Sequence, residues 1–130
     1  MKDNSWLFTL REAFEATGKD FIDLYDLIEA ALVRRKTDFP MLLHNASNGY
    51  GCAAGEGFFY ALDQNWDDPS DFSGVSFYIG EMETSVMAVS DFVTLMEVAI
   101  NVYLTAHPEE EERVLASIER LRLRYGSFLK

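Results

Sequence analysis

The segment from residue 90 to residue 107 constrains the fold of this chain more than any other. Its polar side chains fall at helical spacings of three, four and four residues, which predicts an α-helix capped by Ser90 or Asp91. They are Thr94, Glu97, Asn101 and Thr105, and most of the positions between them are apolar. A helix with so narrow a polar stripe is stable in water only when other elements cover it, so we expect it at the centre of the fold.

Three further segments have apolar residues at helical spacing. The first contains Trp6, Leu7, Leu10 and Phe14 and ends at Thr17-Gly18; the second, capped by Asp20, contains Phe21, Leu24, Ile28, Ala31 and Leu32 and closes with Arg34, Arg35 and Lys36; the last follows Pro108 and contains Val114, Ile118, Leu121 and Tyr125. Pro40 is expected to end any continuation of the second helix.

The middle of the chain has a different pattern. β-branched and aromatic residues dominate 58–62, 75–79 and 84–89, which predicts three strands, with 80–83 joining the last two as a hairpin. Four glycines between residues 45 and 57 predict a loop, and residues 63–74 form a 12-residue connection. The prediction is one α+β domain over residues 1–130: two N-terminal helices, a three-stranded antiparallel sheet and two C-terminal helices.

Charge is strongly segregated along the sequence. Between Thr37 and Glu112 there are 14 Asp and Glu and no Lys or Arg, and all 11 basic residues of this chain of net charge −11 lie outside that stretch. A field of one sign attracts basic surfaces and repels nucleic acid. The sequence therefore predicts a basic protein partner and no nucleic-acid partner.

The expected secondary structure alone explains the positions of some of these acids. Glu109 to Glu112 are expected in the first turn of a helix, where the helix dipole favours negative charge. The acids that need another explanation are predicted on the sheet or its loops: Glu56, Asp63, Asp67, Asp68, Asp71, Glu81 and Glu83. Solvated surfaces usually mix both signs, so a set without a single cation favours a binding surface.

No catalytic, metal or cofactor site is predicted. Residues 63–74 imitate the start of an EF-hand loop, but Asp68 replaces the glycine at position six and Gly74 replaces the glutamate at position twelve. His44, His107 and Cys52 lack the spacing of zinc ligands, and no neighbouring cation activates the cysteine. A general acid–base pair of Glu81 and Glu83 is conceivable on one strand face, but we expect a protein that is not an enzyme.

The cellular compartment follows from weak signals. Cys52 is the single cysteine, which fits a reducing environment. The first residues contain no signal-peptide core, and no apolar run approaches the length of a membrane span. We therefore expect a cytoplasmic location and no membrane partner.

One part of the chain resembles a known family. The residues from Trp66-Asp67-Asp68-Pro69 through Phe77-Tyr78-Ile79-Gly80-Glu81, continuing to Ser90-Asp91-Phe92 and His107-Pro108-Glu109, are similar to immunity proteins of bacterial polymorphic toxin systems, and most of all to those of contact-dependent growth inhibition. The resemblance covers about residues 63 to 110. It implies a cytoplasmic protein that binds and neutralises a cognate toxin domain, very often a nuclease.

The resemblance and the charge pattern together predict where the partner binds. A nuclease holds phosphates with a basic surface, so an acidic surface can occlude it without covalent chemistry. The predicted contact residues are Trp66, Asp67, Asp68, Asp71, Phe72, Glu81 and Glu83, the aromatic ones serving as anchors. A secretion chaperone, which would dimerise around an unfolded segment, is an alternative. A DNA mimic and a small uncharacterised enzyme are weaker alternatives. The oligomeric state is not predicted.

Overall fold

Helix α4 (Val89–Ala106) is central to the fold, as its narrow polar stripe predicts. In the computed structural model, which describes residues 4–129, its apolar positions are buried against α1, α5 and the sheet. The ring of Phe92 lies 5.6 Å from that of Tyr60 in the sheet. The helix begins at Val89, so Ser90 and Asp91 lie inside its first turn and neither is the cap that the sequence suggested.

Three other helices match the predicted segments. They are α1 (Trp6–Ala16), α2 (Ile22–Val33) and α5 (Glu111–Arg124). The apolar residues named for each lie in the hydrophobic core. Two details differ from the prediction: Asp20 makes no cap, because α2 is flanked by Phe21, and Pro108 starts a short 3-10 turn, η3 (Pro108–Glu110), ahead of α5.

Helix α3 (Phe39–Ser47) was not predicted. Pro40 was interpreted as a break, but it occupies the first turn of this helix, where a backbone N–H has no intrahelical partner and proline is tolerated. The side chain of Asp38 caps the helix by accepting a hydrogen bond from the Met41 N–H at 2.9 Å. Pro40 therefore belongs to the start of a helix and does not end one, and α3 packs along α5.

The described residues contain a four-stranded antiparallel sheet, one strand more than predicted. Its order is β1 (Ala53–Gly55), β2 (Phe58–Ala61), β3 (Val75–Ile79) and β4 (Met82–Met87). Strand β1 lies in the glycine-rich segment that was expected to be a loop. Strand β4 begins two residues earlier than predicted, which leaves the two-residue turn Gly80–Glu81, with Gly80 at a φ of 64°.

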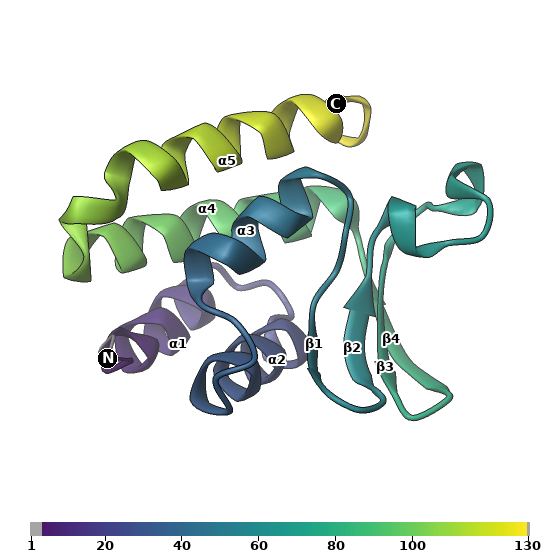
Figure 1. Ribbon diagram of the computed structural model, residues 1–130, viewed down its shortest axis with the longest axis horizontal. Helices are drawn as coiled ribbons and strands as arrows, with labels where there is room; N and C mark the ends of the chain where they lie inside the picture. The colour runs from purple at the N-terminus through teal and green to yellow at the C-terminus, as the bar shows by residue number, and fades with distance from the viewer. Residues whose placement is uncertain (1–3, 130) are drawn as a thin grey trace.

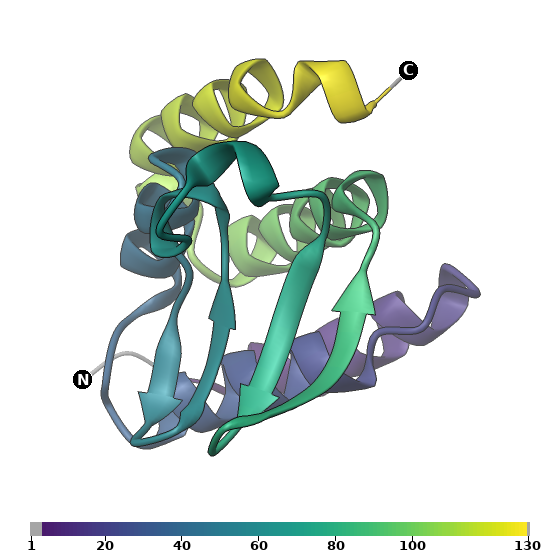
Figure 2. The ribbon, with the colours of Figure 1, turned by 90° about the vertical axis from the view of Figure 1, so that its right-hand side faces the viewer.

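Helices cover only one face of the sheet. In Figure 1 the sheet lies to the right of the helices. Figure 2 shows the outer face of the sheet toward the viewer, with the helices behind it. The turns β1–β2 and β3–β4 meet at one end of the sheet, where the Gly80 N–H donates a hydrogen bond to the Gly57 carbonyl. The connection from β2 to β3, with the short 3-10 turns η1 (Asp63–Asn65) and η2 (Pro69–Asp71), lies at the opposite end.

Helix α4 also has the length and composition of a membrane span, which the sequence analysis did not anticipate. Within the domain 44% of that span is buried. Core helices of globular proteins commonly have both properties, so this is weak evidence for a membrane segment.

Candidate functional site

Folding pairs several acids of the middle stretch with the cations of the two flanking segments. The ion pairs are Lys19–Asp91, Arg113–Asp38, Arg113–Glu110, Arg122–Glu97 and Arg124–Asp63. Most of these groups are partly exposed, so each pair adds little stability. Their effect on charge is larger, because part of the segregation seen in the sequence is cancelled in space.

The acids left over are mainly those of the sheet. Within residues 4–129 no ion pair involves Glu56, Asp67, Asp68, Asp71, Glu81 or Glu83. This is the set that the sequence analysis singled out, without Asp63. The other acids of the stretch without an ion pair are Glu111 and Glu112, in the first turn of α5, where the helix dipole accounts for them.

Asp63 is a structural residue of the loop. Its carboxylate accepts hydrogen bonds from Arg124 Nη2 at 2.7 Å and from the Tyr125 hydroxyl at 2.7 Å. Burial alone would raise the pKa of Asp63, but these hydrogen bonds and one from Gln64 outweigh it and lower the pKa. The group joins the start of the β2–β3 connection to the end of α5.

The sheet acids form two groups rather than one. Asp67, Asp68 and Asp71 lie in the β2–β3 connection, whereas Glu56 and Glu81 lie in the turns at the opposite end of the sheet. The structure therefore does not bring Glu81 together with the aspartates predicted to share its surface. Asp68 also has a local role, because its side chain accepts hydrogen bonds from the hydroxyl and the N–H of Ser70, which lower its pKa.

Phe72 is not available to a partner in this structure. Its side chain is 7% exposed, and its ring lies 5.8 Å from each of the rings of Tyr125 and Phe128. It anchors the β2–β3 connection to the C-terminal end of the chain. Both aromatic residues predicted as anchors line surface cavities: Trp66 lines one beside Phe59 and Tyr78, and Phe72, with little exposed area, lines another beside Arg124 and Tyr125.

Two aromatic residues that the prediction omitted complete this surface. Phe59 of β2 lies opposite Tyr78 of β3, and their rings stack on the outer face with centroids 4.8 Å apart and planes 15° apart. Glu83 of β4 pairs with Tyr78 and lies next to it on the same face. Strand alternation separates Phe59 and Tyr78 from the core residues Tyr60 and Phe77 and is the signal that identifies them.

A shallow cavity of about 270 Å³ lies at one edge of this aromatic face. Its lining residues are Phe59, Ala61, Asn65, Trp66, Asp67 and Tyr78. The side-chain oxygen of Asn65 holds the loop in place by accepting hydrogen bonds from the N–H groups of Gly51 and Leu62, at 2.7 and 2.9 Å. The indole N–H of Trp66 is buried and has no acceptor among the described residues. We call this cavity and the aromatic pair the outer-face site.

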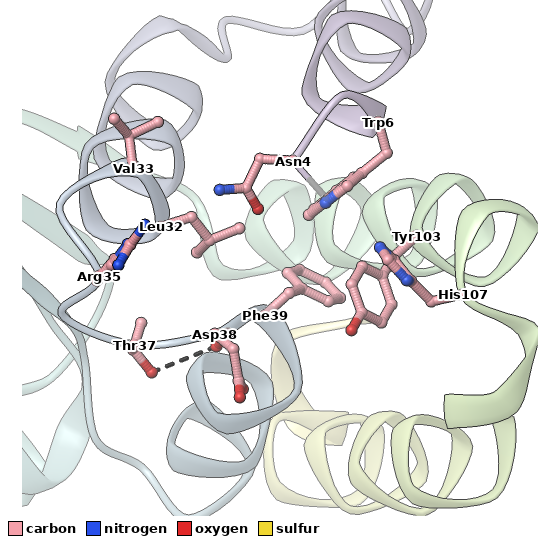
Figure 3. A pocket seen from close by; sticks show the side chains of 10 residues that line it. All are labelled: Asn4, Trp6, Leu32, Val33, Arg35, Thr37, Asp38, Phe39, Tyr103 and His107. Carbon is pink, nitrogen blue, oxygen red and sulfur yellow. Dashed lines mark hydrogen bonds between the residues drawn. The ribbon is translucent and has the colours of Figure 1, made fainter. Parts of the chain in front are cut away.

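A larger cavity lies elsewhere, among the ends of four helices. It has a volume of about 640 Å³, and the rings of Trp6, Phe39 and Tyr103 pack together in its wall, 4.9 to 5.3 Å apart (Figure 3). Arg35, Thr37, Asp38, Asn4 and His107 supply its polar groups. None of the residues weighed for acid–base chemistry, Glu81, Glu83 and His44, lines it.

The structure also shows the surroundings of the histidine and the cysteine that were weighed for other chemistry. The Nδ1 atom of His44 lies 3.1 Å from Nη2 of Arg120. Burial raises the pKa of the Cys52 thiol to about 11, so the reactive thiolate is scarce at neutral pH. Among residues 4–129 no group of three or more His, Cys, Asp or Glu is arranged to hold a metal ion.

No protein-family model, curated protein or solved structure matches this chain. Its own residues are therefore the basis for assigning a function.

Proposed function

We propose that this protein binds a basic protein partner through the outer-face site and the acids beside it, and neutralises that partner by occlusion. The partner is a toxin domain, most simply a nuclease, and the protein acts as its cytoplasmic immunity protein. The observation that carries the proposal is the distribution of paired and unpaired acids. Elsewhere in the middle stretch the acids have cationic partners or lie in the first turn of α5, whereas the six acids of the sheet and its loops have no ion pair among the described residues, and of these only Asp68 and Asp71 belong to a short 3-10 turn.

Charge and packing supply complementary parts of such an interface. The unpaired aspartates attract a basic surface and speed the encounter. The rings of Phe59, Trp66 and Tyr78 offer rigid, partly exposed apolar area, which interfaces use as anchors. A nuclease inhibited in this way keeps its catalytic residues intact and loses access to its substrate.

Charge reversal tests the proposal. We expect the triple variant Asp67→Lys, Asp68→Lys and Asp71→Lys to bind a cognate toxin domain at least about tenfold more weakly than the parent, because reversing charges close to a basic partner removes binding free energy and adds repulsion. Growth protection and affinity, each measured at two salt concentrations, provide the readout. The parent complex should weaken as salt rises.

The matched control changes net charge by the same amount elsewhere. Glu12→Lys, Glu15→Lys and Glu119→Lys alter exposed positions on α1 and α5. Equal loss in both triple variants would mean that only total charge matters and would contradict the placement of the site. Dimers that bind an unfolded segment would instead support the secretion-chaperone alternative.

A further inference from the structure

The composition of the outer-face cavity suits one kind of side chain. Its lining residues include three aromatic residues, Phe59, Trp66 and Tyr78, together with the acid Asp67, and none of them is Lys or Arg. Aromatic faces attract cations through the negative charge of their π-systems. A carboxylate beside them adds a hydrogen-bonded counter-charge. The aromatic faces and the carboxylate both favour a cationic side chain. The apolar lining favours a cation whose charged group is flat or is attached to an apolar stem.

We propose that this cavity receives an arginine side chain of the protein partner. A guanidinium group is planar, is weakly hydrated, stacks on aromatic rings and donates paired hydrogen bonds to a carboxylate, whereas an ammonium group is compact and strongly hydrated. The guanidinium stacks against the aromatic wall and donates to Asp67. The inference rests on the proposed function only for the identity of the partner.

The size of the cavity agrees with a single side chain. About 270 Å³ is slightly below the usual range of small-molecule pockets, so a side chain presented by another protein fits better than a whole cofactor. The site is also preorganised. Phe59 and Tyr78 are held by adjacent paired strands, and Asn65 fixes the backbone immediately before Trp66 through two hydrogen bonds.

Charge around the cavity favours the same occupant. Asp67 has no ion pair within the described residues, and Glu83, which pairs with Tyr78 across the strands, adds a second carboxylate to the same face. Lys19, Arg113, Arg122 and Arg124 form ion pairs with carboxylates other than those of Asp67 and Glu83; Arg124, for example, pairs with Asp63. An arginine from outside therefore meets a negative field without a competing cation in the cavity wall.

The test uses the full chain, labelled with nitrogen-15, and short capped peptides that differ at one central residue: arginine, lysine or citrulline. Citrulline has nearly the shape of arginine without its charge. The chain has two tryptophans, so the indole N–H signal that Trp66→Phe removes reports on the cavity. We expect saturable shifts of this signal with the arginine peptide, weaker binding of the lysine peptide and no binding of the citrulline peptide.

Variants then separate the cavity from the general field. Asp67→Asn and Tyr78→Leu should each weaken binding of the arginine peptide about fivefold or more, because each removes one of the two attractions. Glu119→Gln makes the same change of charge as Asp67→Asn at an exposed position of α5 and should leave binding unchanged. Equal binding of lysine and arginine peptides, equal effects of Asp67→Asn and Glu119→Gln, or no binding would each overturn the proposal.

The experiment also distinguishes the two proposals from each other. Specific binding of the arginine peptide without protection from any toxin would support the cavity and remove the immunity function. Protection that survives Asp67→Asn and Tyr78→Leu, with no specific peptide binding, would support the immunity function and overturn the arginine site.

Discussion

Arg35 has a backbone conformation that glycine usually adopts. It is the one non-glycine among residues 4–129 with a positive φ, 59°. It follows the C-cap of α2, where the Lys36 N–H donates to the Ala31 carbonyl and the Arg35 N–H donates to the Leu32 carbonyl. These two bonds define a Schellman motif, whose left-handed position favours glycine because other residues bring Cβ close to a carbonyl oxygen.

Replacing this residue should therefore stabilise the protein. We expect Arg35→Gly to raise the free energy of unfolding by about 0.5–1 kcal/mol, since relief of the left-handed conformation exceeds the added flexibility of the unfolded chain. Urea denaturation measures the change. Arg34→Gly is the control: Arg34 has a φ of −79° and donates to the Ala54 carbonyl, so its loss should destabilise. A destabilised Arg35→Gly would show that contacts of the arginine side chain outweigh the backbone strain.

Individual residues also show where sequence reasoning reaches its limit. The acids of the sheet could be predicted from the absence of cations around them. Asp63 could not be separated from them, because its partner Arg124 is 61 residues away in the sequence. Phe72 was predicted as an anchor because aromatic residues among the acids could supply apolar contacts to a partner, but the positions of Tyr125 and Phe128 decide its burial.

Among the elements, long amphipathic helices could be predicted and short ones could not. Helix α4 and the three helices like it have enough turns to repeat their apolar pattern. Strand β1 has three residues, too few to show alternation, and its pairing with β2 is irregular. Helix α3 begins at Phe39 with Pro40 in its first turn, so the signal that starts it was interpreted as a signal that ends its predecessor.

The contact between the β2–β3 connection and α5 should make stability depend on pH. The folded-state pKa of Asp63 is lowered, so its contribution is present above the unfolded pKa near 4 and is lost as pH falls through the folded value. At pH 7 we expect Asp63→Asn to cost about 1.5–3 kcal/mol of unfolding free energy, the range for a hydrogen bond to a charged group. Between about pH 5 and pH 2 the variant should then lose less stability than the parent.

Urea denaturation at several pH values measures both effects. Asp71→Asn, which changes an acid in the same connection without an ion pair, should follow the parent. A parallel fall of stability in the parent and in Asp63→Asn would show that the Arg124 contact does not stabilise the folded state.

At the scale of the whole molecule, the order of charges in the sequence becomes an arrangement in space. Lys19, Arg113, Arg122 and Arg124 lie beside acids of the helices and of one loop end, and the acids of the sheet and its loops that have no ion pair among the described residues lie at the two ends of the sheet and on its outer face. The charge segregation along the chain thus predicted the sign of the surface. The division of these acids into two groups depends on strand order, which the sequence did not determine.

This arrangement predicts opposite effects of salt on folding and on binding. Raising NaCl from about 10 mM to about 0.5 M screens repulsion among the unpaired acids, and the exposed ion pairs lose at most about 1 kcal/mol each. We therefore expect Tm to rise by a few degrees while affinity for a basic partner falls. NaCl is the appropriate salt, because sulfate would also strengthen apolar burial.

The triple Asp→Lys variant at positions 67, 68 and 71 provides the control for this prediction. It changes the net charge from −11 to −5, because each of the three substitutions adds two positive charges. With less repulsion to screen, its Tm should depend less on salt than that of the parent, and calorimetry of both proteins over the same salt series measures the difference. A parent Tm that falls with salt would mean that ion pairs dominate the electrostatics of the fold. The acids of the sheet would then not repel one another appreciably, and the field invoked for steering a partner would be too weak to matter.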